Sequence, residues 1–158
     1  MKKFFVLIVP AVALLCSSAV TIAEDGPHDD AIKARQSLMQ LYGYHVGILS
    51  AMAKEKMEYD AELATEAADN LLAVSRMGQS TLWPQGSDNS NPDNAENRAL
   101  PVIWETYPEI AEKGKALNDA LVALSAEAGN GLDALQDSMG DVGGSCKGCH
   151  DDYRAEKK

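Results

Sequence analysis

The chain is short of cysteine, of aromatic residues and of long apolar runs, and each shortage excludes a class of protein. It contains 3 cysteines in 158 residues, too few for a disulfide-rich secreted scaffold. Aromatic residues make up 6%, which is low for a β-sandwich. The formal net charge of -10 argues against nucleic acid as the main partner. Hydrophobic residues at 46% and charged residues at 24% predict one folded, mainly helical domain.

An apolar run of 12 residues, 4–15, follows two lysines at the N-terminus. It is shorter than the ~20 residues that a transmembrane helix needs. A stretch of small residues then ends at Ala23. This pattern is typical of a secretory signal peptide over residues 1–23, and we expect 24–158 to form a single domain with no membrane contact after cleavage. A membrane anchor is the alternative interpretation of the run.

The rest of the chain carries four stretches whose apolar residues recur three, four or seven positions apart. Such spacing places side chains on one face of a helix, and no segment alternates as a strand would. The sequence therefore predicts an all-α fold, an antiparallel four-helix bundle. The four stripes are Ile32, Met39, Tyr42, Val46, Leu49 and Ala53; Ala64, Ala67, Leu71 and Val74; Ile103, Ile110, Leu117, Leu121, Leu124 and Ala128; and Leu132, Leu135, Met139, Val142, Cys146, Cys149 and Tyr153.

Capping and helix-breaking residues predict where these helices begin and end. Asp29 or Asp30 can cap the first helix and Asp60 the second. Pro108 predicts that the third helix either kinks or restarts. Residues 84–94 are rich in Pro, Gly, Ser, Asn and Asp, so we expect a long loop that crosses one end of the bundle.

The chemistry of the chain is concentrated in the run Cys146-Lys147-Gly148-Cys149-His150. A Cys-x-x-Cys-His run is typical of covalent haem c attachment. Residues three and four apart share a helix face, so both thiols can bond one haem while the imidazole reaches its iron. The run predicts one haem c per chain, attached through Cys146 and Cys149, ligated by His150 and enclosed in the bundle because the cysteines continue an apolar stripe.

Three other interpretations of the two cysteines fit less well. A thioredoxin-type redox pair needs a βαβ context, which the helical pattern does not offer. A structural zinc site needs a fourth ligand, and the chain has no second pair of Cys or His residues. A disulfide between residues three apart would strain a helix.

Further segments accompany the haem motif: Arg35-Gln36-Ser37-Leu38-Met39, Trp83-Pro84-Gln85-Gly86-Ser87, Trp104 and Asp151-Asp152-Tyr153-Arg154. With these segments, the chain resembles the class II c-type cytochromes, the cytochrome c-prime family of four-helix-bundle haem proteins. Class I cytochromes carry the motif near the N-terminus with a Met ligand after it, and no Met follows His150. The resemblance implies a periplasmic location and a homodimer through the first two helices.

The resemblance and the chemistry of the side chains together suggest residues of the haem pocket. A guanidinium can clamp a carboxylate, so Arg35, and more weakly Gln36, are predicted to bind a haem propionate. A solvated charge on the helix surface is the alternative for Arg35. Trp104 and Tyr153 are predicted to pack in the pocket. Arg154 either lies near His150 and tunes it or is a simple charge at the C-terminus of the helix.

Met39 is predicted to be the distal residue and the sixth iron ligand, one turn after Arg35 on the first helix. Thioether sulfur is a soft ligand for haem iron, and Met/His ligation raises the reduction potential. Alternatively, Met39 only lines the pocket and leaves the iron five-coordinate. His45 is the rival ligand, but six positions after Met39 it lies about 120° away around the helix. Met139 is predicted to be a core residue.

The main functional prediction is a periplasmic mono-haem cytochrome that transfers single electrons to redox partner proteins of the cell envelope, whose docking surfaces would be basic or neutral. The alternative is a five-coordinate cytochrome c-prime that binds NO or CO. A haem enzyme is a minor alternative, because the first helix offers no acid-base group beside Met39. No catalytic residues are therefore predicted. The dimer would use the second face of the first helix, which carries Leu38, Leu41, His45, Ile48 and Met52.

Overall fold

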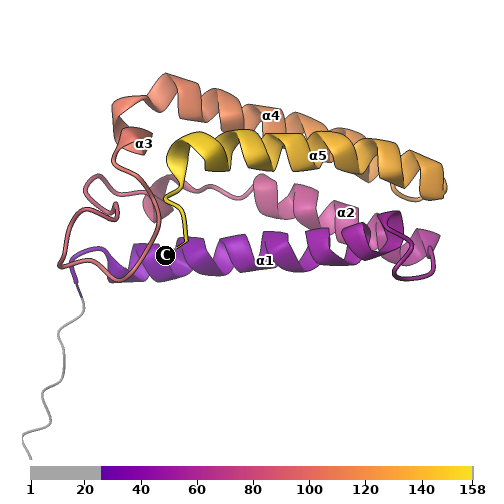
Figure 1. Ribbon diagram of the computed structural model, residues 1–158, viewed down its shortest axis with the longest axis horizontal. Coiled ribbons are helices and arrows are strands. Elements are labelled where there is room, and N and C mark those ends of the chain that lie inside the picture. The colour runs from indigo at the N-terminus through magenta and orange to yellow at the C-terminus, as the bar shows by residue number, and fades with distance from the viewer. Residues whose placement is uncertain (1–25, 158) are drawn as a thin grey trace, which may run out of the picture.

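A computed structural model describes residues 26–157 as a bundle of long helices that alternate in direction (Figure 1). The short helix α3 (Val102–Glu105) and a 3-10 turn, η1 (Ser80–Leu82), lie between the second and third long helices. The predicted antiparallel four-helix bundle is confirmed, whereas the predicted signal peptide lies outside the described residues. The long helices are α1 (Asp29–Ala53), α2 (Ala61–Ser75), α4 (Tyr107–Glu127) and α5 (Leu132–Tyr153).

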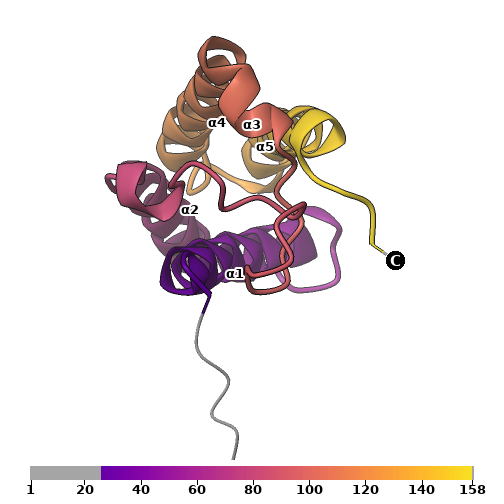
Figure 2. The same ribbon diagram turned by 90° about the vertical axis from the view of Figure 1, so that its left-hand side faces the viewer.

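The four long helices form a ring in which α1 packs on α2 and α5, and α4 packs on the same two (Figure 2). Apolar side chains from all four helices fill the centre of this ring. Completely burying one leucine contributes about 1.5–3 kcal/mol. Within residues 26–157, no helix combines the length and apolar character that a membrane span requires. Fully buried members of the core include Leu49, Met52, Leu71, Leu121, Leu124 and Leu135.

The starts of α1 and α2 differ in how they are capped. The carboxylate of Asp60 accepts the backbone N–H of Leu63 at 3.0 Å, so the predicted cap of α2 is confirmed. The predicted capping of α1 by Asp29 or Asp30 is wrong, because His28 occupies the cap position without a side-chain bond. The carboxylate of Asp29 instead accepts the N–H of Ala95 at 2.5 Å. The Asp29 oxygen that could have capped the helix thus accepts a hydrogen bond from the distant amide of Ala95 instead.

The third helical stripe is interrupted at Pro108, as the sequence predicted. Helix α3 ends at Glu105, Thr106 is non-helical with φ -117° and ψ 47°, and α4 restarts at Tyr107. Pro108 is the second residue of α4, where a missing N–H costs no helical hydrogen bond. Of the two predicted outcomes, the structure therefore adopts the restart rather than the kink.

Residues 76–101, which we call the crossover segment, join α2 to α3 across the end of the bundle where α1 begins and α5 ends (Figures 1 and 2). An antiparallel bridge pairs Ala99 with Arg154, just after α5. The N–H of Leu100 donates to the carbonyl of Tyr153 at 3.1 Å, and the N–H of Ala155 donates to that of Arg98 at 2.9 Å. The predicted loop across one bundle end is confirmed, and it is tied to the C-terminal segment.

Candidate haem site

The haem motif lies on the last turns of α5. Cys146, Cys149 and His150 are each half-buried, and Cys146 packs against the apolar core. The two cysteines do not form a disulfide. A Cβ added at Gly148 would find only Nζ of Lys113 within 4 Å, at 3.7 Å, so the helix surface beside the motif is open. Two free thiols and an imidazole at this spacing fit a covalent haem c with an axial histidine.

Burial holds these groups in neutral form. It raises the pKa of the Cys146 thiol and of the Cys149 thiol above their usual value. Burial also lowers the pKa of His150, and the nearby charges of Arg154 and Arg98 lower it further. A neutral imidazole keeps the lone pair that ligates a metal. The imidazole of His150 therefore has the protonation that iron ligation requires, and the two cysteines are held as thiols.

Helix α1 faces the motif across the bundle. The pKa of Tyr42 is raised mainly by burial, and Cys146 contributes to the shift, so the two residues are neighbours. The two helices are antiparallel (Figure 1). One turn back along α1 from Tyr42 therefore corresponds to one turn forward along α5 from Cys146. This register places Met39 at the level of Cys149 and His150.

Met39 differs from its neighbours in burial. Its side chain is 42% exposed, whereas Leu38 is 4% exposed and Arg35 3%. Met39 is therefore not part of the buried core, and its role as the distal residue stays a prediction. The rival ligand His45 lies half-buried, with its ring 5.1 Å from that of Tyr44. Nδ1 of His45 has no hydrogen-bond partner among the described residues.

Arg35 points into the crossover segment. Its Nη1 donates to Oγ of Ser87 at 2.6 Å and to the carbonyl of Leu82 at 3.4 Å. Its Nη2 donates to the carbonyl of Ser87 at 2.5 Å and to Oδ1 of Asn97 at 3.1 Å. The guanidinium carbon also lies 4.9 Å from the ring centroid of Trp83. Both terminal nitrogens of the guanidinium are thus engaged by the protein itself.

This environment decides between two interpretations of Arg35. A solvated surface charge is wrong, because the side chain is buried. The pKa of Arg35 is lowered, because burial disfavours its charge more than the neighbouring carboxylate of Asp88 favours it. Asp88 is itself buried. Among the described residues, only Nη1 and Nη2 of Arg35 are seen to donate hydrogen bonds. The propionate contact stays a prediction.

Gln36 and Trp104 also contact the crossover segment. Nε2 of Gln36 donates to the carbonyl of Glu96 at 2.8 Å. Nε1 of Trp104 donates to the carbonyl of Trp83 at 3.1 Å, and the two indole rings lie 6.3 Å apart. The structure therefore brings both predicted pocket residues to the same bundle end as Arg35.

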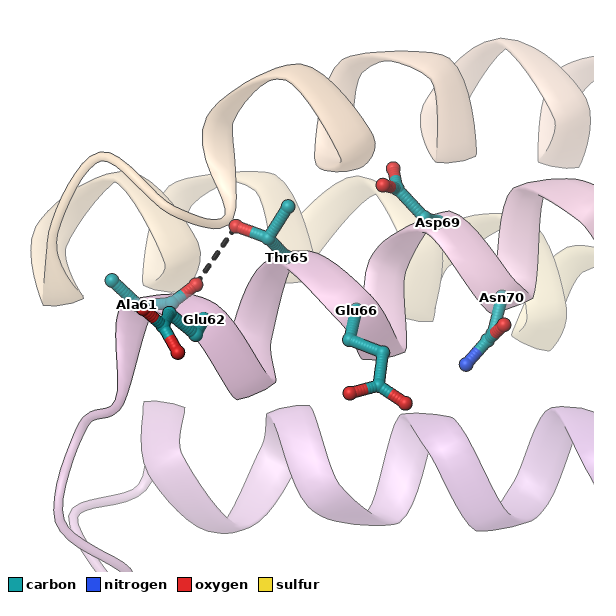
Figure 3. Close-up of a pocket in the computed structure, with 6 residues that line it drawn as sticks. All are labelled: Ala61, Glu62, Thr65, Glu66, Asp69 and Asn70. Carbon is teal, nitrogen blue, oxygen red and sulfur yellow. Dashed lines mark hydrogen bonds between the residues drawn. The ribbon is translucent and has the colours of Figure 1, made fainter.

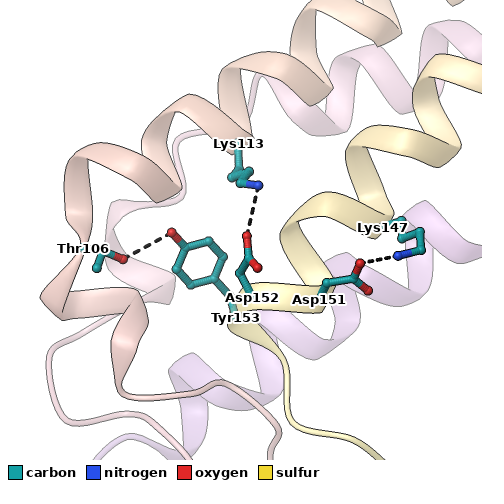
Figure 4. A network of polar contacts seen from close by, with 6 residues as sticks. All are labelled: Thr106, Lys113, Lys147, Asp151, Asp152 and Tyr153. Atoms are coloured by element: carbon teal, nitrogen blue, oxygen red, sulfur yellow. Dashed lines mark hydrogen bonds and ion pairs between the residues drawn. The ribbon is translucent and has the colours of Figure 1, made fainter.

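The end of α5 is fastened to α4 by polar contacts (Figure 4). Tyr153 is 7% exposed, and its hydroxyl lies 3.2 Å from that of Thr106. Lys113 on α4 forms an ion pair with Asp152, Nζ to Oδ2, at 3.1 Å. Both partners of this pair are substantially exposed, so it contributes little to stability. A second ion pair, within α5, joins Lys147 and Asp151.

The residues that bind Arg35 cannot be identified from the sequence. Trp83 and Ser87 belong to a segment noted for its resemblance, but nothing local marks them as partners of α1. Asn97 is separated from Arg35 by 62 positions. Only the tertiary fold brings such residues together.

A shallow depression lies on the surface of α2, away from the haem motif (Figure 3). Its only internal hydrogen bond runs from Oγ1 of Thr65 to the carbonyl of Ala61 at 2.8 Å. None of the predicted site residues lines it. The lining residues are Ala61, Glu62, Thr65, Glu66, Asp69 and Asn70.

Comparison with known proteins agrees with this arrangement. The family model described as Cytochrome C' matches residues 30–154. The chain belongs to the cytochrome c' family. It is 38% identical over 149 residues to cytochrome c-554 of Cereibacter sphaeroides, covering 92% of this chain and 96% of that one. It is 35% identical to cytochrome c' of the same species, covering 88% and 91%.

Solved structures of this family have the same fold. The structure described as cytochrome c' from Rhodobacter Spheriodes matches with a TM-score of 0.78 and 34% identity, covering 81% of this chain and 97% of that one. Cytochrome c' from Shewanella frigidimarina matches with a TM-score of 0.71 and 32% identity, covering 80% and 95%. As a cytochrome c' family member, the chain is a mono-haem c-type cytochrome that binds haem c covalently. The cofactor predicted from the sequence is therefore confirmed.

Proposed function

We propose that this protein is a cytochrome of the cell envelope that binds a diatomic gas, NO or CO, at a five-coordinate haem. Two solved structures of the cytochrome c' from Alcaligenes xylosoxidans, at 34% and 33% identity, are described as carrying NO. These relatives favour the gas-binding alternative over the electron carrier that the sequence analysis placed first. The proposal includes no catalytic residues and no enzymatic turnover.

In this proposal, α5 supplies the attachment and one axial ligand. Cys146 and Cys149 form thioethers to the haem, and His150 ligates the iron through its neutral imidazole. The bound haem supplies an iron that can take a small ligand or change its charge by one electron. Arg154, exposed and four positions after His150, adds a positive charge beside that ligand.

The observation that carries the proposal is the exposure of Met39 on the distal side. It is an apolar residue at the level of His150, and 42% of its side chain is left uncovered by protein. A thioether in this place limits the space open to a ligand and keeps that space apolar. Small uncharged gases suit such a pocket better than charged or bulky ligands do.

A second candidate function rests on the same side chain. Thioether sulfur can itself ligate haem iron, and with His150 it would make a six-coordinate electron carrier of raised potential. The two functions differ in one bond, between the Met39 sulfur and the iron. Redox partners of the cell envelope would then dock on the protein with a salt-dependent affinity, because the chain is strongly acidic.

Visible spectra of the haem-loaded protein separate the two functions. The gas-binding proposal expects a high-spin reduced protein that takes up CO at neutral pH, both in the wild type and in Met39→Leu. The electron-carrier function expects a low-spin wild type that excludes CO, and a Met39→Leu variant that becomes high-spin and takes it up. Met139→Leu, a similar change at a half-buried methionine of α5 that packs on the core, is the matched control.

The proposal extends to location and assembly. The predicted signal peptide would deliver the chain to the periplasm. One cytochrome c' structure, 26% identical with a TM-score of 0.73, is described as having a ligand-controlled dimer dissociation. We infer a homodimer through α1 and α2. Leu38 and Met52 are buried in the bundle, so the α1 contacts would come from Leu41 and Tyr44, which are 48% and 66% exposed.

A further inference from the structure

Asn97, in the crossover segment, stands where two hydrogen-bond systems meet. Its Oδ1 accepts from Nη2 of Arg35 at 3.1 Å and from the backbone N–H of Ala99 at 3.0 Å. Its Nδ2 donates to the carbonyls of Ala95 at 3.0 Å and Asp88 at 3.3 Å. One carboxamide oxygen therefore joins a charged side chain of α1 to the backbone of the crossover segment.

Ala99, whose N–H binds Asn97, lies in the stretch of the crossover segment that pairs with the end of α5. Ala99 forms the antiparallel bridge with Arg154, the residue that ends α5. The flanking bonds run from Leu100 N–H to the carbonyl of Tyr153 and from Ala155 N–H to that of Arg98. The N–H of Arg154 itself donates to the carbonyl of His150 at 3.3 Å. Hydrogen bonds, joined by the backbone of residues 97–100, thus connect Arg35 through Asn97 to the end of α5 that carries the haem motif.

We propose that Asn97 is a positioning residue that fixes the separation of α1 and the end of α5 on the two sides of the haem. It acts on α1 through Arg35 and on α5 through the bridge between Ala99 and Arg154. A hydrogen bond from a charged donor is roughly twice as strong as one between neutral groups, so the Arg35 contact holds the shared oxygen firmly. The inference requires the haem site but not a choice between gas binding and electron transfer.

Residue-resolved amide hydrogen exchange on the haem-loaded protein tests this role. The reporters are the N–H groups of Leu100 and Ala155, which do not contact Asn97. Asn97→Ala removes the shared oxygen and should speed exchange at both amides about tenfold, the order expected for losing such a bond. Asn97→Asp keeps an acceptor oxygen for Arg35 and Ala99 but loses the Nδ2 donor to Ala95 and Asp88, so exchange should be slower than in Asn97→Ala without reaching the wild-type rate.

A second pair of variants separates positioning from simple loosening of the loop. Arg35→Lys disrupts the bond to Asn97 together with those to Ser87 and Leu82, whereas Ser87→Ala removes only the Oγ acceptor of the same guanidinium. If Asn97 transmits the constraint, Arg35→Lys speeds exchange at Ala155 and Ser87→Ala does not. In the Asn97→Ala background, Arg35→Lys should then have a smaller effect than it has in the wild type, because the bond to Asn97 is already lost.

Several outcomes would overturn the proposal. It fails if Asn97→Ala leaves both reporter amides unchanged, or if Ser87→Ala affects them as strongly as Arg35→Lys does. It also fails if the effects of Arg35→Lys and Asn97→Ala multiply in the double variant. Should Asn97→Ala not fold, the contrast between Arg35→Lys and Ser87→Ala decides the question alone. None of these readouts measures gas binding, so their failure leaves the proposed function untouched.

Discussion

The two sides of the haem site are built in different ways. On α5, Cys146, Cys149 and His150 lie within five consecutive residues, and helical geometry alone brings them together. On α1, Arg35 is buried by contacts with Ser87 and Asn97, which are 52 and 62 positions away. The first side depends on local spacing and the second on the path of a long segment.

The residues proposed to attach the haem and the residues proposed to shape its distal side are therefore brought into place differently. Any α-helix with the Cys-x-x-Cys-His spacing can present the attachment groups. In the proposed site, the distal side would instead require α1 to be held at a set distance and rotation, and Arg35 is the buried residue of α1 that bonds to the crossover segment. The choice between a gas ligand and a Met39 ligand therefore depends on tertiary packing more than on the motif.

The largest effect is expected from breaking the local side. In the double variant Cys146→Ala, Cys149→Ala, no thioether can form, so haem colour should pass into the solvent on acid-acetone extraction. In the wild type it should stay with the protein pellet. Bundle stability should also fall, because the space between α1 and α5 loses the contacts of an anchored haem. Colour that stays with the double variant would contradict the attachment assigned here.

His150→Ala is the matched control for that experiment. It leaves both thiols in place, so colour should remain in the pellet, while the Soret band should shift with the loss of the axial imidazole. An unchanged ferrous spectrum would mean that another residue, such as His45, ligates the iron.

Sequence reasoning was accurate where structure depends on local spacing and incomplete where it depends on distant partners. The four helices, the Asp60 cap and the covalent cofactor followed from periodicity and a five-residue motif. The assigned cap at Asp29 failed because Ala95, far along the chain, supplies the donor. The burial of Arg35 could not be predicted, since no local signal marks a guanidinium whose acceptors lie on a loop.

The non-local side can be broken at Arg35 with an intermediate effect. Arg35→Met keeps much of the apolar volume but leaves the buried acceptors of Ser87 and Asn97 without their donor. We expect the free energy of unfolding, measured with guanidinium chloride on the haem-loaded protein, to fall by about 2–4 kcal/mol.

Gln36→Ala, the next residue on α1, is the control for the Arg35 variant. Its single bond to the crossover segment is exposed, so the loss should stay below about 1 kcal/mol. Equal losses in the two variants would show that Arg35 does not anchor the segment.

The smallest expected effect comes from removing the charge of Asp88, which lies beside Arg35 in the crossover segment. Hydrogen bonds from the Ser90 hydroxyl and the Ser90 N–H lower the pKa of this carboxyl, and Arg35 adds to the shift. A lowered pKa in the folded state means that the stabilisation is present above the unfolded-state pKa, near 3.8, and is lost as the pH falls through the folded-state pKa.

Asp88→Asn should therefore cost about 1 kcal/mol at pH 7, because charge-assisted bonds become neutral ones. Unfolding curves at a series of pH values should show the difference from wild type shrinking below about pH 3.8. The loss in Arg35→Met should persist in part at low pH, since the guanidinium stays charged and its carbonyl acceptors do not titrate. A difference for Asp88→Asn that is constant with pH would show that shape, and not charge, holds this part of the crossover segment against α1.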